Sequence, residues 1–320
     1  MKISVIGCGR WGTFIAWYLD KLNNQVTLIG REGSERFSAL SLARRNDYVT
    51  LPESVRFSTD MNGKAAMSDV IIISVGAQNL RGLLATVDKN VLSEKIFILS
   101  MKGVESNSGK RLSQVAEECG INKDNLAVWL GPGHIQEFVL GKPNCMVIDS
   151  ANVKLTAMLV EAFRSDLIRF YYGDDLIGNE IGAAAKNVLG ICAGILDGAN
   201  MSTLKGALMA RGAREVARLI RAMGGSELSA YGLCHLGDYE TTLFSRYSHN
   251  RAFGEAYFKK EKFDKLAEGV ETARALKLLG EKYGVELPIT NAVYSILFES
   301  KDPLKQLSSL FSRSATKEFL

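Results

Sequence analysis

Lys186 is the residue whose surroundings point most directly to chemistry. It lies in residues 182–188, inside an Ala- and Gly-rich stretch that is apolar nearly all round, so we expect a helix buried in a core. A buried ammonium needs a partner, or a lowered pKa that suits proton transfer. Asn187 beside it and Asp238, in Leu236-Gly237-Asp238, could be partners. The alternative is a lysine whose stem is buried and whose ammonium reaches solvent.

Two further groups of residues follow predicted strands. Lys102 comes shortly after the apolar run 95–100, and Gly131-Pro132-Gly133 comes directly after the run 126–130. Ligands of open α/β sheets bind outside the carboxyl ends of the strands. We therefore expect Lys102 to reach into a ligand cleft, and the glycine turn to expose backbone N–H groups to the ligand.

The start of the chain has the pattern of a dinucleotide-binding loop. A short apolar run, residues 2–6, leads into Gly7, Gly9 and Gly12, which fit G-x-G-x-x-G. The first glycine allows a tight turn, the second lets the backbone approach a pyrophosphate, and the third allows close packing of the following helix. A predicted helix over 13–22 and a strand over 25–29 supply the β-α-β context. The alternative is an ordinary tight strand–turn–helix.

The end of the second predicted strand bears on the choice of cofactor. An acidic residue there binds the ribose 2′-hydroxyl of NAD, whereas an arginine accommodates the 2′-phosphate of NADP. Gly30 stands where an acid is expected, and Arg31 follows it. The sequence therefore favours NADP(H). NAD(H) remains possible because Glu32 could reach the ribose, and Arg31 could also be a solvated loop charge.

The elements that must position these residues change in character along the chain. Continuous apolar runs between helices indicate a parallel sheet covered on both faces; they span residues 69–75, 95–100, 126–130 and 145–148, and 168–172 is expected to close the sheet. Beyond that point the pattern is helical, with predicted helices over 177–196, 207–223, 270–283 and 289–298.

The predicted fold is α/β: an N-terminal Rossmann domain with a doubly wound, mostly parallel sheet, and a C-terminal all-helical domain. We expect the first, dinucleotide-binding domain over residues 1–174 and the second, substrate and catalytic domain over 175–320. The active site should then lie in the cleft between them.

The composition is that of an ordinary soluble globular protein. The chain has 320 residues, 47% hydrophobic and 23% charged, with a net charge of +4 and no Lys/Arg run that suggests nucleic-acid binding. Its five cysteines have neither disulfide-framework nor zinc spacing, so no metal is expected. The apolar runs are too short to span a bilayer, and no signal peptide fits before the first strand. We expect a cytoplasmic protein.

These motifs together resemble a known family, and the resemblance covers essentially the whole chain. The series G-x-G-x-W-G, Lys-Gly, Gly-Pro and Gly-x-Glu-x-Gly-Ala-x-x-Lys-Asn resembles NAD(P)-dependent sn-glycerol-3-phosphate dehydrogenase of bacterial type. Leu236-Gly237-Asp238 and Asn250-Arg251-x-Phe253-Gly254 extend the match. The resemblance implies reversible reduction of dihydroxyacetone phosphate to sn-glycerol 3-phosphate, which supplies glycerophospholipid synthesis. It also implies a homodimer.

The resemblance assigns roles to individual residues. Lys186 matches the proton donor and acceptor, Lys102 a second active-site lysine, and Asp238 the group that would hold Lys186 in place. The substrate-binding residues are expected to be Lys102, Gly131, Gly133, Lys186, Asn187, Asp238, Thr242, Ser248, His249, Asn250 and Arg251. The cofactor-binding residues are expected to be Gly7, Gly9, Arg10, Trp11, Gly12, Arg31, Lys102, Ile135, Leu266 and Glu268.

The sequence departs from the family pattern at three places on the substrate side. His249 stands where Ser-Arg-Asn is common, and it is a weaker, pH-dependent cation without the guanidinium fork. Gly133 stands where the family usually has a serine, and residues 199–204 replace a glycine-rich stretch. Drift within one activity explains these changes. The alternatives are a related dehydrogenase of another phosphorylated ketose or keto compound, and a catalytically silent nicotinamide-binding regulator.

Overall fold

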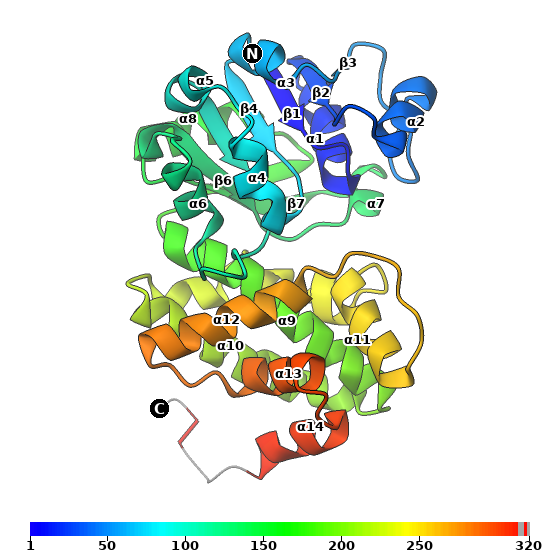
Figure 1. Cartoon of the computed structure of the whole chain (residues 1–320), viewed down its shortest axis with the longest axis vertical. Coiled ribbons are helices and arrows are strands. Elements are labelled where there is room, and N and C mark those ends of the chain that lie inside the picture. Colours follow the sequence, from blue (N-terminus) through cyan, green and yellow to red (C-terminus); the bar gives the residue numbers. More distant parts are fainter. Residues whose placement is uncertain (313–316, 319–320) are drawn as a thin grey trace.

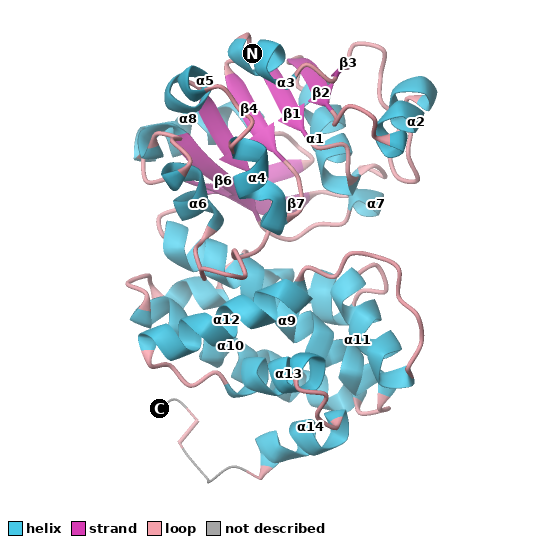
Figure 2. Ribbon diagram, in the orientation of Figure 1, coloured by secondary structure: helices cyan, strands magenta, loops and turns pink. Residues whose placement is uncertain are grey.

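A computed structural model describes residues 1–312, 317 and 318. It shows a domain built on a sheet stacked on a helical domain (Figure 1, Figure 2). β8 ends at Tyr172 and α9 begins at Leu176, on either side of residue 174. The end of the second expected domain, residues 313–316 and 319–320, lies outside the described residues.

One eight-stranded sheet has the order β3-β2-β1-β4-β5-β6-β7-β8. All neighbouring strands are parallel except β6 and β7, which confirms a mostly parallel sheet. The strand order reverses at β1: β2 and β3 lie on one side of it, and β4 and the later strands lie on the other. Ligands of such folds bind at the point between β1 and β4 where the order reverses. The strands are β1 Lys2–Ile6, β2 Gln25–Ile29, β3 Arg56–Ser58, β4 Val70–Ile73, β5 Ile96–Leu99, β6 Leu126–Leu130, β7 Asn144–Asp149 and β8 Ile168–Tyr172.

The central strands are apolar throughout because both faces of the sheet are covered. In β4, Val70 and Ile72 belong to a core cluster shared with α1 and α8, while Ile71 and Ile73 belong to a second cluster shared with α4, α5 and α6. Successive side chains of a strand point to opposite faces, so an unbroken β-branched run supplies both layers. The helices of this domain are α1 Arg10–Lys21, α2 Glu35–Ala43, α3 Met61–Ala66, α4 Leu80–Leu84, α5 Lys89–Glu94, α6 Leu112–Glu118, α7 Ile135–Phe138 and α8 Val153–Phe163.

The helical domain is built around α9, which packs against α10, α11, α12 and α13. α9 is long and apolar enough to cross a membrane, but 89% of its most apolar window is buried inside the protein, as a core helix must be. The helices are α9 Leu176–Gly198, α10 Lys205–Ala222, α11 His249–Lys259, α12 Gly269–Tyr283, α13 Pro288–Phe298 and α14 Pro303–Phe311.

Glycines bring the backbones of α9 and α11 into direct contact. A Cβ on Gly194 would lie 1.9 Å from the carbonyl oxygen of Arg251, and a Cβ on Gly254 would lie 2.1 Å from that of Ile191. No larger residue fits at either position without separating the two helices. The glycines therefore fix how α11 sits on α9.

The first turns of α9 are anchored to the Rossmann domain. Glu180 accepts hydrogen bonds from the Ser113 backbone N–H at 2.9 Å and hydroxyl at 2.6 Å, and pairs with Arg111 at 2.5 Å. Its side chain is almost completely buried. A buried carboxylate persists when several donors compensate its lost hydration, as they do here.

Candidate active site

The loop between β1 and α1 has the shape that its glycines predict. Gly7 has φ +113°, and a Cβ there would lie 2.2 Å from the Ser74 carbonyl oxygen. A Cβ on Gly12 would lie 2.0 Å from the Gly7 carbonyl oxygen, whereas one on Gly9 would meet nothing within 4 Å. No side chain caps the N-terminus of α1. The open space beside uncapped N–H groups fits the phosphates of a dinucleotide.

At the end of β2, the structure leaves no room for an acidic side chain at Gly30. A Cβ there would fall 2.0 Å from the ring of Phe37, which α2 places against the strand end. Arg31 and Glu32 follow, and both are exposed. The first side chain that can face a ribose at this strand end is therefore that of Arg31.

Two ammonium groups share one buried carboxylate where the two domains meet. Asp238 Oδ2 lies 2.5 Å from Lys186 Nζ, on α9, and 2.7 Å from Lys102 Nζ, which follows β5. Lys102 also donates to the Gly131 carbonyl oxygen at 2.6 Å, at the end of β6. Lys102 and Lys186, which are 84 positions apart along the chain, are thus joined through Asp238. The Thr241 hydroxyl also contacts Asp238.

Burial and charge set the protonation of this cluster. Burial lowers the pKa of Lys186 to about 7, against the opposing effect of the Asp238 carboxylate. Burial disfavours the ionised form of Asp238, but the ammonium groups of Lys102 and Lys186 outweigh it and lower the pKa of that carboxyl. Lys186 can therefore gain or lose a proton near neutral pH while Asp238 stays charged.

Lys186 is surrounded by polar groups from three elements. It donates to the Thr242 hydroxyl at 2.9 Å, in the π-helical turn Glu240–Phe244. Next to it on α9, the Asn187 amide oxygen accepts from Asn250 Nδ2 at 3.0 Å, and Asn250 in turn accepts from the Gly269 N–H at 2.9 Å. Thr242 and Asp238 thus contact the ammonium itself, and Asn250 is bound to Asn187, the neighbour of Lys186 on α9.

The structure places four further expected cofactor residues in different surroundings. Trp11 packs against Phe14 in α1, and Ile135 is buried beneath the same aromatic layer. Burial raises the pKa of the Glu268 carboxyl, whereas a bond from the Ala77 N–H lowers it. Leu266 is exposed, and its carbonyl oxygen is 3.2 Å from His249 Nδ1. In residues 1–312, 317 and 318, no three His, Cys, Asp or Glu side chains form a metal site.

The comparisons with known proteins agree with this geometry. The family models described as NAD-dependent glycerol-3-phosphate dehydrogenase N-terminus and C-terminus match residues 2–156 and 175–308. The chain belongs to this family. A glycerol-3-phosphate dehydrogenase [NAD(P)+] of Thermoanaerobacter sp. is 33% identical and one of Chlorobium phaeobacteroides 34%, each over 99% of both chains. The crystal structure of glycerol-3-phosphate dehydrogenase from Coxiella burnetii aligns over 98% of this chain and 99% of its own, at 28% identity and a TM-score of 0.89.

The serine that the resemblance led us to expect at Gly133 does not fit in this chain. Gly133 has φ +154°, and a Cβ there would lie 2.3 Å from the ring of Phe138. Phe138 is buried and stacks on Phe14, with ring centroids 5.0 Å apart. Phe138 of α7 therefore fills the space that a side chain at position 133 would need.

The second departure, His249, lies at the junction of the domains. Its Nε2 is 2.8 Å from an Arg10 guanidinium nitrogen, and Arg10 also lies over the ring of Tyr48. Burial and the neighbouring Arg10 charge lower the pKa of His249, so it is neutral and accepts from Arg10. A cavity of about 120 Å³ here is lined by Arg10, Tyr48, Gln136, Arg246, Tyr247, Ser248, His249, Ala252, Phe263 and Lys265.

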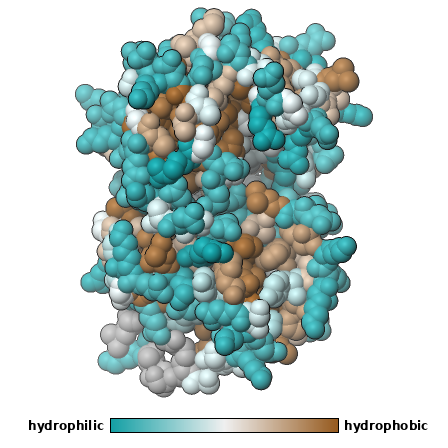
Figure 3. Space-filling model, viewed as in Figure 1, coloured by the Kyte–Doolittle hydropathy of each residue, from teal (hydrophilic) through white to brown (hydrophobic). Residues whose placement is uncertain are grey.

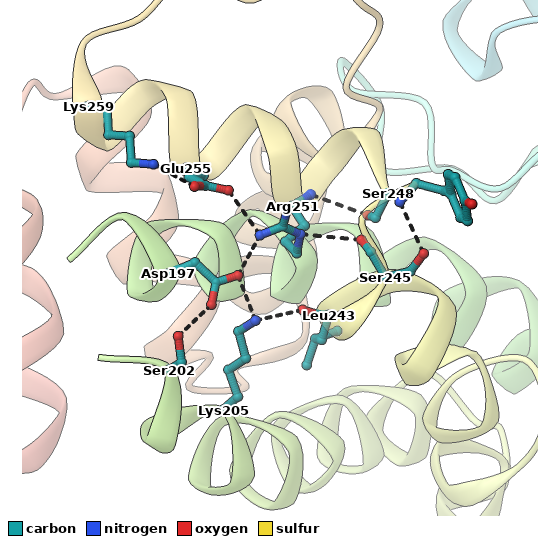
Figure 4. A network of polar contacts seen from close by, with 10 residues as sticks. Asp197, Ser202, Lys205, Leu243, Ser245, Ser248, Arg251, Glu255 and Lys259 are labelled. Carbon is teal, nitrogen blue, oxygen red and sulfur yellow. Dashed lines mark hydrogen bonds and ion pairs between the residues drawn. The ribbon is translucent and has the colours of Figure 1, made fainter. Parts of the chain in front are cut away.

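Arg251 is held in a separate ionic network (Figure 4). Its guanidinium is 2.6 Å from Asp197 Oδ2 and 3.0 Å from Glu255, and its Nε donates to the Ser245 carbonyl oxygen at 3.3 Å. None of these partners belongs to the Lys102–Asp238–Lys186 cluster. Ser248, also in the expected substrate set, caps α11 by accepting from the Arg251 N–H at 3.3 Å.

Two polar side chains of the site do not stand out in the sequence. His134 Nε2 and Gln136 Oε1 are buried, and neither has a hydrogen-bond partner within the described part of the chain. His134 lies against the ring of Tyr247, and its pKa is lowered by burial and affected by the charges of Asp238 and Lys186. The available signal is their position directly after Gly131-Pro132-Gly133. Buried polar atoms in a cleft are those that a ligand would satisfy.

Proposed function

We propose that this protein reversibly reduces dihydroxyacetone phosphate to sn-glycerol 3-phosphate with NAD(P)H. The observation that carries the proposal is the Asp238 carboxylate shared by the ammonium groups of Lys102 and Lys186, 2.7 and 2.5 Å away, where the Rossmann domain meets the helical domain. When bound, the nicotinamide cofactor supplies the hydride, and this chain's residues supply binding, orientation and the proton.

Lys186 is the general acid of the reduction. Negative charge grows on the C2 oxygen as the carbonyl is reduced, and the buried ammonium donates a proton to it. In the opposite direction the neutral amine accepts that proton, which a pKa of about 7 allows. Lys102 remains close enough to stabilise the developing oxyanion. Asp238 holds both nitrogens and keeps their separation small.

Cations around the small cavity between the domains support a phosphorylated ligand. Arg10, Arg246 and Lys265 line it together with the neutral His249, and none of the lining residues is acidic. Such a lining attracts anions and disfavours neutral compounds of the same size. We infer that this cavity binds a phosphate group, either of the substrate or of the cofactor.

We infer a preference for NADP(H) over NAD(H). Phe37 occupies the space that an acidic side chain on Gly30 would need, and the next residue, Arg31, is exposed and free to approach a 2′-phosphate. Glu32 keeps NAD(H) usable. A cytoplasmic homodimer that supplies glycerophospholipid synthesis is the biological setting we infer, and light scattering of the purified protein tests the dimer.

The experiment is an initial-rate assay of NADPH and NADH oxidation with dihydroxyacetone phosphate. The wild type, Lys186→Met and Arg31→Ala are compared, and NADPH binding is measured for each by fluorescence. We expect Lys186→Met to lose about 10²–10⁴-fold in kcat with NADPH still bound. Arg31→Ala should weaken NADPH more than NADH.

Three outcomes would contradict parts of this proposal. Unchanged turnover in Lys186→Met would show that Lys186 is not the general acid. Wild-type turnover with a different phosphorylated ketone, and none with dihydroxyacetone phosphate, would show that the substrate is that other ketone. Tight NADPH binding with no turnover on any such ketone would favour a silent nicotinamide-binding regulator.

A further inference from the structure

Asp197, at the end of α9, joins the starts of two other helices. Its Oδ2 accepts from Lys205 Nζ, at the start of α10, and from Arg251, in the first turn of α11, each at 2.6 Å. Its Oδ1 accepts from the Ser202 hydroxyl at 2.7 Å. All three contacts converge on one side chain (Figure 4). Burial disfavours its charged form, but the bonds from Lys205, Ser202 and Arg251 outweigh burial and lower its pKa.

Each of the two cations also reaches a backbone carbonyl beyond Asp197. Lys205 Nζ donates to the carbonyl oxygen of Leu243 at 3.0 Å, and Arg251 Nε donates to that of Ser245 at 3.3 Å. The Leu243 carbonyl lies in the last part of the π-helical turn Glu240–Phe244, and the Ser245 carbonyl, which also accepts from the Ser248 N–H at 3.2 Å, lies just after it. The Asp197 charge thus holds the two donors that fix this piece of backbone.

The segment held in this way carries residues of the site on both sides. Thr242 immediately precedes Leu243 and accepts from Lys186 at 2.9 Å. Ser248 and Asn250 follow Ser245, and Asn250 donates to Asn187 at 3.0 Å. A shift of the two carbonyls would therefore move Thr242, which contacts the Lys186 ammonium, and Asn250, which contacts the adjacent Asn187.

Asp197 itself is too far along α9 to touch the reacting atoms. It comes eleven residues after Lys186, which at 1.5 Å per residue is about 16 Å along the helix. The direct backbone contact of α9 and α11 at Gly194 and Gly254 leaves α11 little freedom to adjust its distance. The contacts of Asp197 and the glycine contact of α9 with α11 together fix the position of the start of α11.

We propose that Asp197 is a positioning residue, which through Lys205 and Arg251 fixes the backbone of residues 242–250 against Lys186. Its effect on the reaction is indirect, and the kinetic part of this inference rests on the proposed function. The same network gives Arg251 a role that needs no contact with substrate.

The test compares Asp197→Asn with Glu215→Gln as a matched control. Asn keeps the shape and the Ser202 bond but removes the charge. Asp197 is partly buried, and Glu215 is a buried carboxylate of the same domain that likewise holds a helix start, because it accepts from the N–H groups of Ile289 and Thr290 at the start of α13. Amide hydrogen exchange, KM, kcat and the NADPH dissociation constant are measured well below each variant's melting temperature.

For Asp197→Asn we expect faster exchange over residues 240–250, and kcat/KM lower by about 10- to 100-fold with NADPH binding unchanged. For Glu215→Gln we expect faster exchange over 288–298 with KM and kcat unchanged. Lys205→Met, which keeps the Asp197–Arg251 pair, should lower kcat more than it raises KM because its contact lies beside Thr242. Asp197→Asn with unchanged exchange over 240–250, or with unchanged KM and kcat, would overturn the inference. Exchange does not depend on which ketone is reduced, so a wrong substrate would leave that readout intact.

Discussion

The single carboxylate of Asp238 cannot fully compensate two ammonium groups, and this decides how Lys186 behaves. Both nitrogens bind the same oxygen, Oδ2, while Lys186 is almost completely buried and Lys102 is partly exposed. Proton loss is therefore easiest for Lys186, where hydration of the charge is weakest. This asymmetry gives the two lysines different parts in one reaction.

Opposite pH dependence in the two directions follows from the Lys186 pKa of about 7. Reduction needs the ammonium, so its kcat/KM should be constant below pH 7 and fall about tenfold per pH unit above it. Oxidation needs the neutral amine, so its kcat/KM should rise to about pH 7 and then level off. Initial rates in both directions from pH 5.5 to 9 check this. Ionisation of a substrate phosphate moves both profiles alike, so two profiles with the same direction would contradict the assignment.

At residue scale, the sequence predicted the chemical types but not all the contacts. Lys102, Lys186 and Asp238 were expected in one cleft, and the structure brings them together. Arg251 was expected at the substrate; its guanidinium contacts Asp197, which the sequence did not predict, and its contact with substrate stays a prediction. The spacing of a motif does not tell which way a long, flexible side chain extends when carboxylates lie on either side of it.

At the scale of elements, the turn that carries Asp238 is tied to α9 through His235. The His235 ring is fully buried; its Nδ1 is 2.8 Å from the Gly182 carbonyl oxygen, and its Nε2 is 2.7 Å from the Tyr239 hydroxyl. The neutral tautomer with the proton on Nδ1 satisfies both contacts, since the hydroxyl then donates to Nε2. A charged ring would lose this arrangement.

The stability of the fold should therefore fall in mild acid. Burial lowers the pKa of His235 to about 4, whereas an unfolded chain binds that proton near pH 6.5. The stabilisation that neutral His235 gives to the fold is complete above pH 6.5 and is lost as the pH falls towards 4. The free energy of unfolding should by then have dropped by about 3 kcal/mol. Urea unfolding between pH 7 and 4 measures it. His235→Gln, which can keep both hydrogen bonds, should show a shallower loss; parallel curves for the two proteins would exclude His235 as the cause.

The sequence predicted the elements well where hydrophobic runs are long. The mostly parallel sheet and the buried helix around Lys186 are confirmed. β3 was not expected, because three residues of mixed exposure leave no periodic signal. The reversal at β7 was not expected either, since an apolar strand reads the same in both directions and only the connection through α7 decides its pairing.

At the scale of the whole molecule, the two domains meet through apolar as well as charged contacts. Ala183 and Cys234 of the helical domain belong to a core cluster of the sheet domain. The space-filling view shows a narrowing between them with many hydrophilic side chains (Figure 3). Arg10 from the sheet domain and His249 from the helical domain are paired across this junction at 2.8 Å. A neutral ring is what permits this pairing without bound anion, because a second cation there would repel the guanidinium.

His249→Arg should therefore make the stability of this junction depend on ligand. Two guanidinium groups beside Arg246 and Lys265 lower stability by about 1 kcal/mol in the ligand-free protein, and a bound phosphate group removes that cost. Thermal unfolding should show a lower melting temperature for the variant alone and a larger increase on adding NADPH. His249→Gln, which adds no charge, is the control. Equal increases in the variant and the wild type would contradict this reading of the junction.

The anchoring of Glu180 to Arg111 and Ser113 has a kinematic consequence. The first turns of α9, and with them the amine of Lys186 six residues later, are attached to the sheet domain although α9 belongs to the helical core. The proton donor therefore shares one frame with the sheet domain. Because α11 is held against α9 at Gly194 and Gly254, it belongs to that frame too, and a rotation of the whole helical domain would have to break the bonds of Glu180.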